Sequence, residues 1–307
     1  MPKSVIHTEG LTKIYKGELG QAPVVGVESL DLDVREGEVF AFLGPNGAGK
    51  TTTIKLLTRL LFPTKGNVLI MGRPLSSRES MRRVGYLPEQ PNLYGYLTGA
   101  EFLDFMARIF GLQREVRKKR IPEVLGWVGL SDHGGRAIRT YSRGMMQRLG
   151  MAQALINDPD LLILDEPMSA LDPVGRKDFR DLILGLKKRG KTLFFSSHIL
   201  SDAEMVADRI GILKKGRMTQ TGRLDDLTGL RSGVIEVTFV PNRGKPAKSA
   251  FQKYNLDVQG RKILVRLENE EDLPALIREI TRAGARLVSV IPQRQSLEDI
   301  FMAEIGR

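Results

Sequence analysis

The sequence contains no cysteine, and its 307 residues include only three histidines and one tryptophan. Without cysteine, disulfide bonds, thiolate metal sites and cysteine nucleophiles are excluded, and the chain suits a reducing compartment such as the cytosol. No stretch approaches the roughly 18–20 consecutive apolar residues that a membrane-spanning helix requires. The segment from Met1 to His7 lacks the apolar core of a secretory signal. These absences predict a cytoplasmic chain that does not itself cross a membrane.

Positive charge, by contrast, is abundant. Charged residues make up 27% of the sequence, and the formal net charge is +11. A basic balance of this size favours an anionic partner, which leaves nucleotides, nucleic acids and lipid surfaces open. The densest basic run extends from Arg114 to Arg120. We interpret it as a solvated helix face, with a surface facing a membrane or RNA as the alternative.

One glycine-rich stretch organises the rest of the chain. It fits the pattern G-x-x-x-x-G-K-[ST] of a phosphate-binding loop and consists of Gly44, Pro45, Asn46, Gly47, Ala48, Gly49, Lys50 and Thr51. An apolar run over 39–43 enters it and a helical run over 52–57 leaves it, so the motif has its required strand–turn–helix context. The alternative is a glycine-rich turn in a purely structural β-α unit.

The chemistry of phosphate explains this spacing. Glycines allow several backbone N–H groups to turn toward one anion, and the following helix presents its positive dipole end. We expect Lys50 to reach the β- and γ-phosphates of a nucleoside triphosphate and the Thr51 hydroxyl to bind Mg²⁺. Thr52 is expected to add a second hydroxyl to the phosphates.

Acidic residues follow a second buried strand. The apolar run over 161–164 ends directly at Asp165 and Glu166, and ligands of open α/β sheets bind at this edge. Asp165 is expected to hold Mg²⁺ through water, and Glu166 to polarise an attacking water. A further apolar strand over 192–197 ends at His198, which could contact the γ-phosphate at the same edge. The alternative is a strand that merely ends in a solvated acidic turn.

The segment between these motifs is expected to be helical. Residues 98–112 predict a helix that begins with a capping box of Thr98 and Glu101, and a second helix covers about 115–129. The apolar stripe of the first helix is typical of a core, with a partner-docking face as the alternative. Before the insertion, residues 5–43 favour β-structure, and strands are expected within 66–75 and 84–89.

Together these motifs resemble the ATP-binding subunits of ABC transporters. The decisive segment, Tyr141 to Leu149, is similar to the family signature L-S-G-G-Q-x-Q-R-L. Ser196-Ser197-His198 resembles the switch histidine loop, and Ser169 to Asp172 resembles the D-loop. Tyr15, which we expect in an exposed polar loop, stands where the family has its adenine-stacking aromatic residue. The resemblance covers about residues 5–222.

The resemblance implies a fold and a mechanism. Residues 1–222 would form an α/β P-loop ATPase domain of the ABC type, with a β-subdomain and a helical insertion over about 95–155. Two copies would close head to tail on two ATP molecules and Mg²⁺, each nucleotide lying between residues 44–52 of one copy and Ser142 and Gly144 of the other. Asp172 is also expected at the nucleotide. Loss of the γ-phosphate on hydrolysis would reopen the homodimer.

The expected partner is an integral-membrane permease formed by separate subunits. The resemblance implies that the chain is bound peripherally to the inner face of the cell membrane, and that the helical insertion contacts the permease. The signature and the tail resemble an efflux-type subgroup that exports drugs, sodium ions, antibiotics or polysaccharides. No nucleic-acid partner is expected.

Two departures from the family pattern affect the site. Glu89 stands where the family has the glutamine of its Q-loop; a carboxylate can still bind metal-held water, so Glu89 is expected near Mg²⁺. Arg143 and Met145 replace a glycine and a glutamine of the signature. Ser142 and the Gly144 backbone, which are expected to touch the γ-phosphate, are retained.

Residues 231–307 predict a separate accessory α+β domain. Strands are expected over 234–240, 262–267 and 286–291, and helices over 246–254, 271–283 and 296–305. We interpret the order as β-α-β-β-α-β, which is typical of a small ferredoxin-like domain. Such a fold does not reveal a function. The tail could brace the dimer, which we favour, or bind a regulatory ligand, or do neither.

Two other functions compete with transport. A soluble ABC-type ATPase that remodels ribosomes or DNA would use the positive charge, but such relatives usually carry two cassettes or a long coiled coil, and this sequence has neither. A nucleotide-binding regulator without turnover is disfavoured because Lys50, Asp165, Glu166 and His198 are all present.

Overall fold

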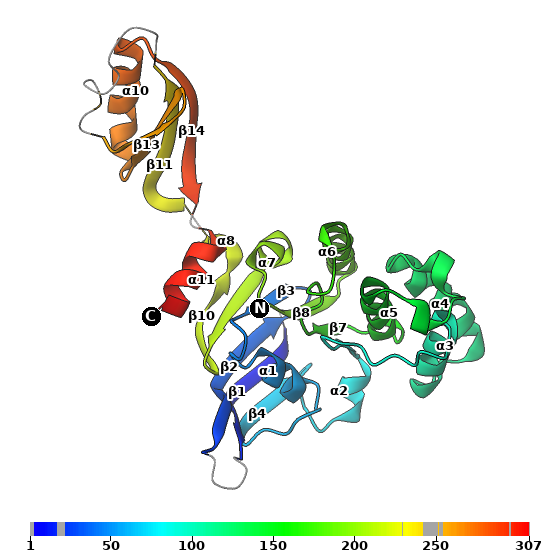
Figure 1. The fold of residues 1–307 in the computed structure, drawn as a ribbon. Helices are drawn as coiled ribbons and strands as arrows, with labels where there is room; N and C mark the ends of the chain where they lie inside the picture. Colours follow the sequence, from blue (N-terminus) through cyan, green and yellow to red (C-terminus); the bar gives the residue numbers. More distant parts are fainter. Residues whose placement is uncertain are drawn as a thin grey trace. The chain divides into compact units, whose positions relative to one another are not determined.

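A computed structural model of the chain describes residues 3–16, 22–228, 230–241, 251, 254–294 and 296–306. The chain divides into two compact units, residues 1–224 and residues 225–307 (Figure 1). Each unit has its own core and is described by itself. Within the described residues, no helix combines the length and the apolar character needed to cross a bilayer.

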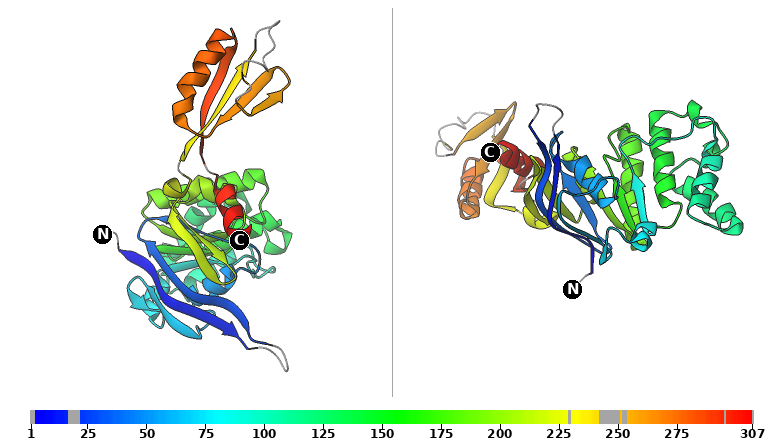
Figure 2. Two further views of the ribbon diagram at one scale, coloured as in Figure 1. Left: turned by 90° about the vertical axis from the view of Figure 1, so that its left-hand side faces the viewer. Right: turned by 90° about the horizontal axis from the view of Figure 1, so that it is seen from below.

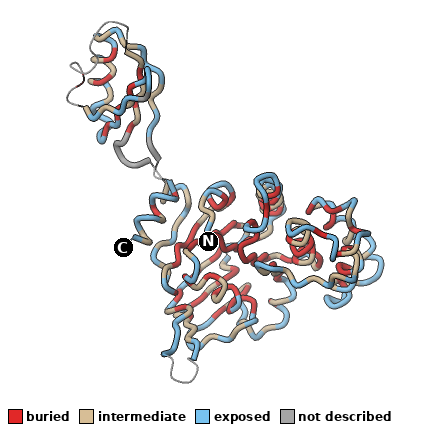
Figure 3. The backbone as a smooth tube through the Cα atoms, viewed as in Figure 1, coloured by how far each residue is buried: buried red, intermediate tan, exposed pale blue. Residues whose placement is uncertain are grey.

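The centre of the first unit is a six-stranded sheet with the strand order β10-β9-β3-β8-β7-β6. Five strands run parallel, and β10 is antiparallel to β9. The inner strands consist almost entirely of apolar residues, as expected for strands covered on both faces, and Figure 3 shows them as buried. Their bounds are β3 Val39–Leu43, β6 Val84–Leu87, β7 Leu161–Leu164, β8 Thr192–Ser197, β9 Arg209–Lys214 and β10 Arg217–Arg223.

A four-stranded antiparallel sheet forms the second layer of this unit and corresponds to the predicted β-subdomain. Its order is β2-β1-β4-β5, and the views of Figure 2 show its long blue strands beside the central sheet. One apolar core joins residues of both sheets and of α1. The bounds are β1 Ser4–Tyr15, β2 Val24–Arg35, α1 Lys50–Leu57, β4 Lys65–Ile70 and β5 Arg73–Pro74.

The helical insertion lies between β6 and β7 in the chain. The predicted capping box at its first helix is confirmed, since the Thr98 hydroxyl accepts from the Glu101 N–H and the Glu101 carboxylate accepts from the Thr98 N–H. Its helices are α3 Gly99–Ile109, α4 Arg114–Trp127 and α5 Arg143–Leu155, with short 3-10 turns at Ser131–His133 and Ile138–Thr140. The remaining helices of the unit are α2 Arg78–Arg82, α6 Pro173–Lys188 and α7 Leu200–Val206, and the short helix α8 Leu224–Leu227 begins at the last residue of this unit and continues into the second.

The basic run at the start of α4 is only partly a solvated face. The Arg117 side chain bonds to Asp104 at 2.6 Å, and Arg120 bonds to Asp158 at 3.1 Å. Both arginine side chains are at least 85% buried. These two cations therefore fasten α4 to its neighbours, because buried charges are retained only when paired.

The second unit is a four-stranded antiparallel sheet with the order β12-β13-β11-β14. The first and third strands are central, as in a ferredoxin-like domain. Strand β12 was not predicted, and it supplies the hairpin that the β-α-β-β-α-β order requires. The predicted helix over 246–254 falls almost wholly outside the described residues. The bounds are β11 Leu230–Val240, β12 Leu256–Gln259, β13 Lys262–Leu267, a 3-10 turn Glu270–Asp272, α10 Leu273–Arg282, β14 Arg286–Arg294 and α11 Leu297–Gly306.

Candidate nucleotide-binding site

A cavity of about 540 Å³ opens at the C-terminal end of β3, where the phosphate-binding loop begins. Sequence motifs that lie far apart in the chain meet at its walls. The predicted residues that line it are Tyr15, Pro45, Asn46, Gly47, Gly49, Lys50, Thr51, Thr52, Glu89, Glu166 and His198.

The phosphate-binding loop has the backbone geometry that its glycines allow. Gly49 has φ +107°, and a Cβ atom there would lie 2.3 Å from the Gly26 carbonyl oxygen, so only glycine fits. Helix α1 begins at the next residue, without a side-chain cap and without an acidic residue in its first turn. Its positive dipole end is therefore directed at the cavity with no protein anion in that turn to neutralise it.

Lys50 and Glu166 form a buried ion pair in the floor of the cavity. The Lys50 Nζ lies 3.3 Å from Glu166 Oε1, and both side chains are more than 90% buried. The ammonium also donates to the Gly44 carbonyl at 2.7 Å and to the Pro45 carbonyl at 3.3 Å. Lys50 is thus held at the loop that would receive the phosphates.

Glu166 is held on several sides. Its Oε2 lies 2.8 Å from His198 Nδ1, and its N–H donates to the Ser196 hydroxyl at 2.9 Å. The Ser169 hydroxyl donates to its carbonyl at 2.9 Å. Glu166 also has φ +46°, a conformation that costs a non-glycine residue free energy and occurs preferentially at functional sites. The surrounding bonds fix this carboxylate between Lys50 and His198.

Asp165 lies just beneath the cavity and is almost fully buried. Burial raises the pKa of its carboxyl, while hydrogen bonds from Ser196 and Thr51 act in the opposite direction. The Ser196 hydroxyl donates to Oδ1 at 2.7 Å and the Thr51 hydroxyl at 3.4 Å. Burial and the nearby Asp165 charge also raise the pKa of Tyr86 to about 12.

These oxygen atoms suit Mg²⁺. The ion binds through one or two carboxylates together with phosphates and waters, and the Thr51 and Asp165 oxygens lie together at the phosphate-binding loop. The described residues contain no cluster of three or more histidine, cysteine, aspartate or glutamate side chains that could hold a metal alone. Glu89 is exposed on the cavity wall and is the remaining acidic candidate.

Tyr15 forms an aromatic wall of the cavity. It does not lie in a loop, as predicted, but is the last residue of strand β1, because the pairing with β2 continues to Tyr15 and Val24. Its hydroxyl lies 3.1 Å from the Thr52 hydroxyl. A Cβ atom on Gly26 would lie 2.7 Å from the Tyr15 ring, so this glycine leaves room for it. Tyr15 is 38% exposed, and its ring can stack on a flat base.

Six predicted residues do not line the cavity. Gly44 contributes its carbonyl to Lys50, Ala48 is buried inside the loop, and Asp165 lies below. Ser142 caps α5 by accepting from the Met145 N–H, and Gly144 lies in the same turn. Asp172 caps α6 by accepting from the Gly175 N–H. Ser142, Gly144 and Asp172 are therefore not brought to the nucleotide cavity of their own chain.

Some residues of the site were not predicted. Val24, Val25, Gly26 and Ser169 line the cavity, and Ser196 joins Asp165 to the Glu166 backbone. Ser196 stands at a strand end that the sequence had already marked, so its position was a usable signal. The stretch 24–26 carries no local motif, and only the pairing of β1 with β2 places it beside Tyr15.

Comparison with known proteins gives consistent matches, which cover nearly the whole chain for the curated relatives. The ABC transporter family description matches residues 27–169. An uncharacterised ABC transporter ATP-binding protein of Nostoc sp. is 45% identical over 99% of this chain and 90% of its own. A bacitracin transport ATP-binding protein of Bacillus licheniformis is 35% identical over 99% and 98%. A dimeric ATP-binding cassette in a post-hydrolysis state, bound to ADP and phosphate, has 28% identity and a TM-score of 0.66, and covers 71% of this chain and 98% of its own.

Proposed function

The chain belongs to the ATP-binding proteins of ABC transporters, and we propose that it closes as a head-to-tail homodimer on ATP and Mg²⁺ to power export. As a member of this family it is an ATPase that works with membrane permease subunits. One observation supports head-to-tail closure: the cavity gathers Tyr15, Lys50 and Glu166, whereas Ser142 and Gly144 of the signature lie outside it.

The signature has the properties of a second phosphate-binding surface. Ser142 is exposed at the N-terminus of the 13-residue helix α5, and no acidic residue lies in the first turn. The positive end of the helix dipole and the Gly144 N–H are therefore available to an anion. In the proposed dimer that anion is the γ-phosphate bound by the other copy.

The proposed chemistry follows from the cavity floor. Lys50 would exchange its contact with Glu166 for the β- and γ-phosphates, which frees the Glu166 carboxylate to orient and polarise a water in line with the γ-phosphate. His198, whose Nδ1 is 2.8 Å from Glu166, would keep that carboxylate in position and contact the γ-phosphate. Thr51, Asp165 and Glu89 would hold Mg²⁺, which supplies charge neutralisation at the phosphates.

The test is ATP-dependent dimerisation of the Glu166→Gln variant, measured by size-exclusion chromatography with light scattering. With ATP and Mg²⁺ the variant should elute with the mass of two chains. Adding Ser142→Asp should abolish the dimer but not ATP binding, because aspartate still caps α5 while its charge repels the γ-phosphate. Thr98→Asp makes a similar N-cap change on α3, outside the cavity, and should leave the dimer intact. A Ser142→Asp monomer that no longer binds ATP would contradict the head-to-tail arrangement.

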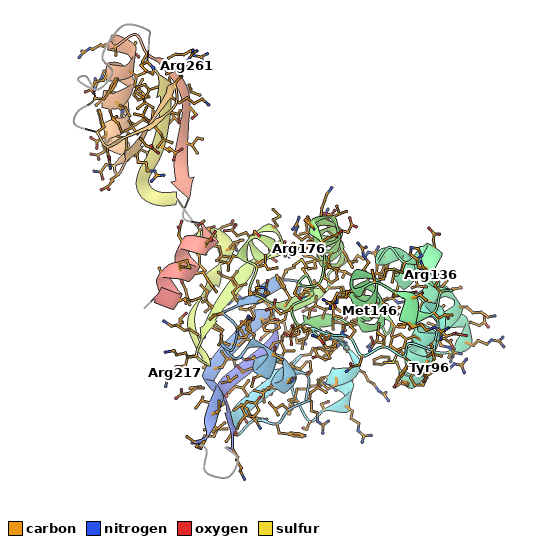
Figure 4. The ribbon with its side chains drawn as sticks, in the orientation of Figure 1. Tyr96, Arg136, Met146, Arg176, Arg217 and Arg261 are labelled. Carbon is orange, nitrogen blue, oxygen red and sulfur yellow. The ribbon has the colours of Figure 1, made fainter. Side chains whose placement is uncertain are left out.

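We further infer that the permease docks on the insertion. A groove of about 750 Å³ there is lined by Tyr94, Tyr96, Leu97, Ala100, Glu101, Asp104, Phe105, Arg108 and Ile121. Tyr96 is 77% exposed, at the outer surface of the insertion (Figure 4). The Tyr94 ring packs against Tyr96 and Phe105 at centroid distances of 5.9 and 5.8 Å. An amphipathic helix of the permease fits this groove, and such docking would place the chain peripherally on the inner face of the membrane.

Export is supported by the relatives that match the full chain, the second unit included. Two of them are named bacitracin transport ATP-binding proteins, from Bacillus licheniformis and Enterococcus faecalis. The test is expression of the chain with its cognate permease in a bacitracin-sensitive host. Resistance should rise with the wild type and not with Glu166→Gln. Equal sensitivity of both strains would exclude bacitracin as the cargo.

A further inference from the structure

A partly buried ion pair joins the helix that follows His198 to the helix that follows Asp172. Asp202, in the first turn of α7, is 2% exposed. Its Oδ1 accepts a hydrogen bond of 2.5 Å from Arg180 Nη1 on α6. Its other oxygen, Oδ2, is buried without a hydrogen-bond partner. In the part of the chain that the structure describes, Arg180 is therefore the cation that neutralises Asp202.

This pair anchors the start of α7, which has no side-chain cap. The helix begins at Leu200, two residues after His198, and its N-cap Ile199 has no side-chain oxygen to offer. On the strand side, the Ser197 hydroxyl accepts from the Ile199 N–H at 2.9 Å. On the helix side, the anchor is Asp202. The His198 side chain is itself 46% exposed, so the backbone on either side sets its position more than packing does.

Arg180, the cation of the pair, lies on α6, and the segment just before α6 contacts Glu166. Helix α6 starts at its cap Asp172, and three residues earlier the Ser169 hydroxyl bonds to the Glu166 carbonyl. Figure 1 shows α6 and α7 side by side, and Figure 4 labels Arg176, one helical turn before Arg180. The contacts thus form a ring that runs from Glu166 along α6, across the ion pair to α7, and through His198 back to Glu166.

We propose that Arg180 and Asp202 are positioning residues for ATP hydrolysis. The pair holds α7 against α6 so that His198 Nδ1 stays within hydrogen-bond distance of Glu166. Because the pair links the two helices, a displacement of α6 at Asp172, where the second copy would dock, would also move His198. The inference rests on the proposed role of His198 at the γ-phosphate and adds residues that no motif of the sequence marked.

The experiment compares Arg180→Gln and Asp202→Asn with the matched control Lys187→Gln in the full chain. Lys187 lies on the same helix and forms an ion pair of equal length, 2.5 Å, with Asp208, but at the far end of α6. Both test variants should lower kcat about 10- to 100-fold, because misplacement of a catalytic group by ~1 Å has effects of this size. The KM for ATP should stay within about twofold, since the loop and Tyr15 are untouched. Lys187→Gln should leave kcat within about twofold.

The charge-swapped variant Arg180→Asp with Asp202→Arg separates positioning from folding. It should recover part of the lost kcat, and melting curves should show that the variants are folded at the assay temperature. A kcat within twofold of wild type in both single variants, or a loss that only follows the unfolded fraction, would overturn the positioning role. Wild-type hydrolysis by His198→Ala and Glu166→Gln would instead refute the proposed chemistry, so the two failures are distinguishable.

Discussion

Replacing Glu166 with glutamine tests the central ion pair of the cavity. The change removes one charge and almost no volume. At 3.3 Å, an effective dielectric constant of about 20 gives an attraction to Lys50 of about 5 kcal/mol. The desolvation of two buried charges offsets most of this attraction, and we take a net value of about 1.4 kcal/mol, which corresponds to a factor of ten in binding. ATP must displace this contact, so Glu166→Gln should bind ATP up to about tenfold more tightly.

Turnover should change in the opposite direction. If Glu166 polarises the attacking water, its loss should lower kcat by about 10²- to 10⁴-fold, the range of a general base. The assay pairs equilibrium ATP binding with phosphate release at saturating ATP. Glu89→Gln makes the same chemical change on the exposed cavity wall. Its kcat should stay within about fivefold of wild type, because glutamine, the residue that the family has at this position, keeps an oxygen that can bind metal-held water.

The two measurements refute different steps of this reasoning. Hydrolysis by Glu166→Gln at the wild-type rate would mean that another group polarises the water. Weaker ATP binding by the variant would mean that Glu166 holds Lys50 ready for the phosphates instead of competing with them. A large loss of turnover in Glu89→Gln as well would shift the catalytic role toward the Q-loop position.

Three further perturbations follow from the structure. Burial raises the pKa of Asp165, so the protonated form of Asp165 stabilises the fold at low pH, and this stabilisation is lost as the pH rises through the raised pKa. Asp165→Asn should therefore melt at a higher temperature than wild type at about pH 7.5 in metal-free buffer. The difference in melting temperature should vanish near the usual aspartate pKa of about 4. Tyr15→Ala should weaken ATP binding by about tenfold in a fluorescence titration, since base stacking contributes ~1–3 kcal/mol, whereas Tyr15→Phe should bind like wild type. Phe105→Asp should lose the permease in co-purification but keep ATPase activity, because the groove lies on the insertion.

The parts of the site that could be predicted from sequence are those built by consecutive residues. The loop from Gly44 to Thr51 carries its own strand and helix on either side, and Asp165 and Glu166 follow directly on β7. Local backbone geometry alone then places Lys50 and Thr51. The strand that ends at His198 also placed this residue at the same sheet edge, whereas the case for Tyr15, which no local pattern joins to the loop, rested mainly on the family resemblance.

The rest depends on pairing between distant segments. Tyr15 was expected in a loop because Lys13 and Lys16 make its surroundings polar, yet the antiparallel partner β2 extends the strand to Tyr15. The same pairing brings Val24, Val25 and Gly26 to the cavity wall. In the second unit β12 was missed because it has four residues, Leu256–Gln259, with Asp257 interrupting the apolar pattern. Short strands of this kind are specified by their neighbours more than by propensity.

Ser142 and Asp172, which lie outside the cavity, differ in the hydrogen bonds that their side chains can still form. As the cap of α5, the Ser142 hydroxyl only accepts from Met145 N–H, so its proton remains available for donation to a phosphate oxygen of a second copy. Asp172 caps α6 in the same way, but an ionised carboxylate has no proton to donate. Ser142 can therefore cap its helix and bind the γ-phosphate at once, whereas Asp172 must meet donors. In a head-to-tail dimer, the hydroxyl and N–H groups of the facing copy are such donors, so we expect Asp172 to act across the interface on protein groups and not on the nucleotide itself.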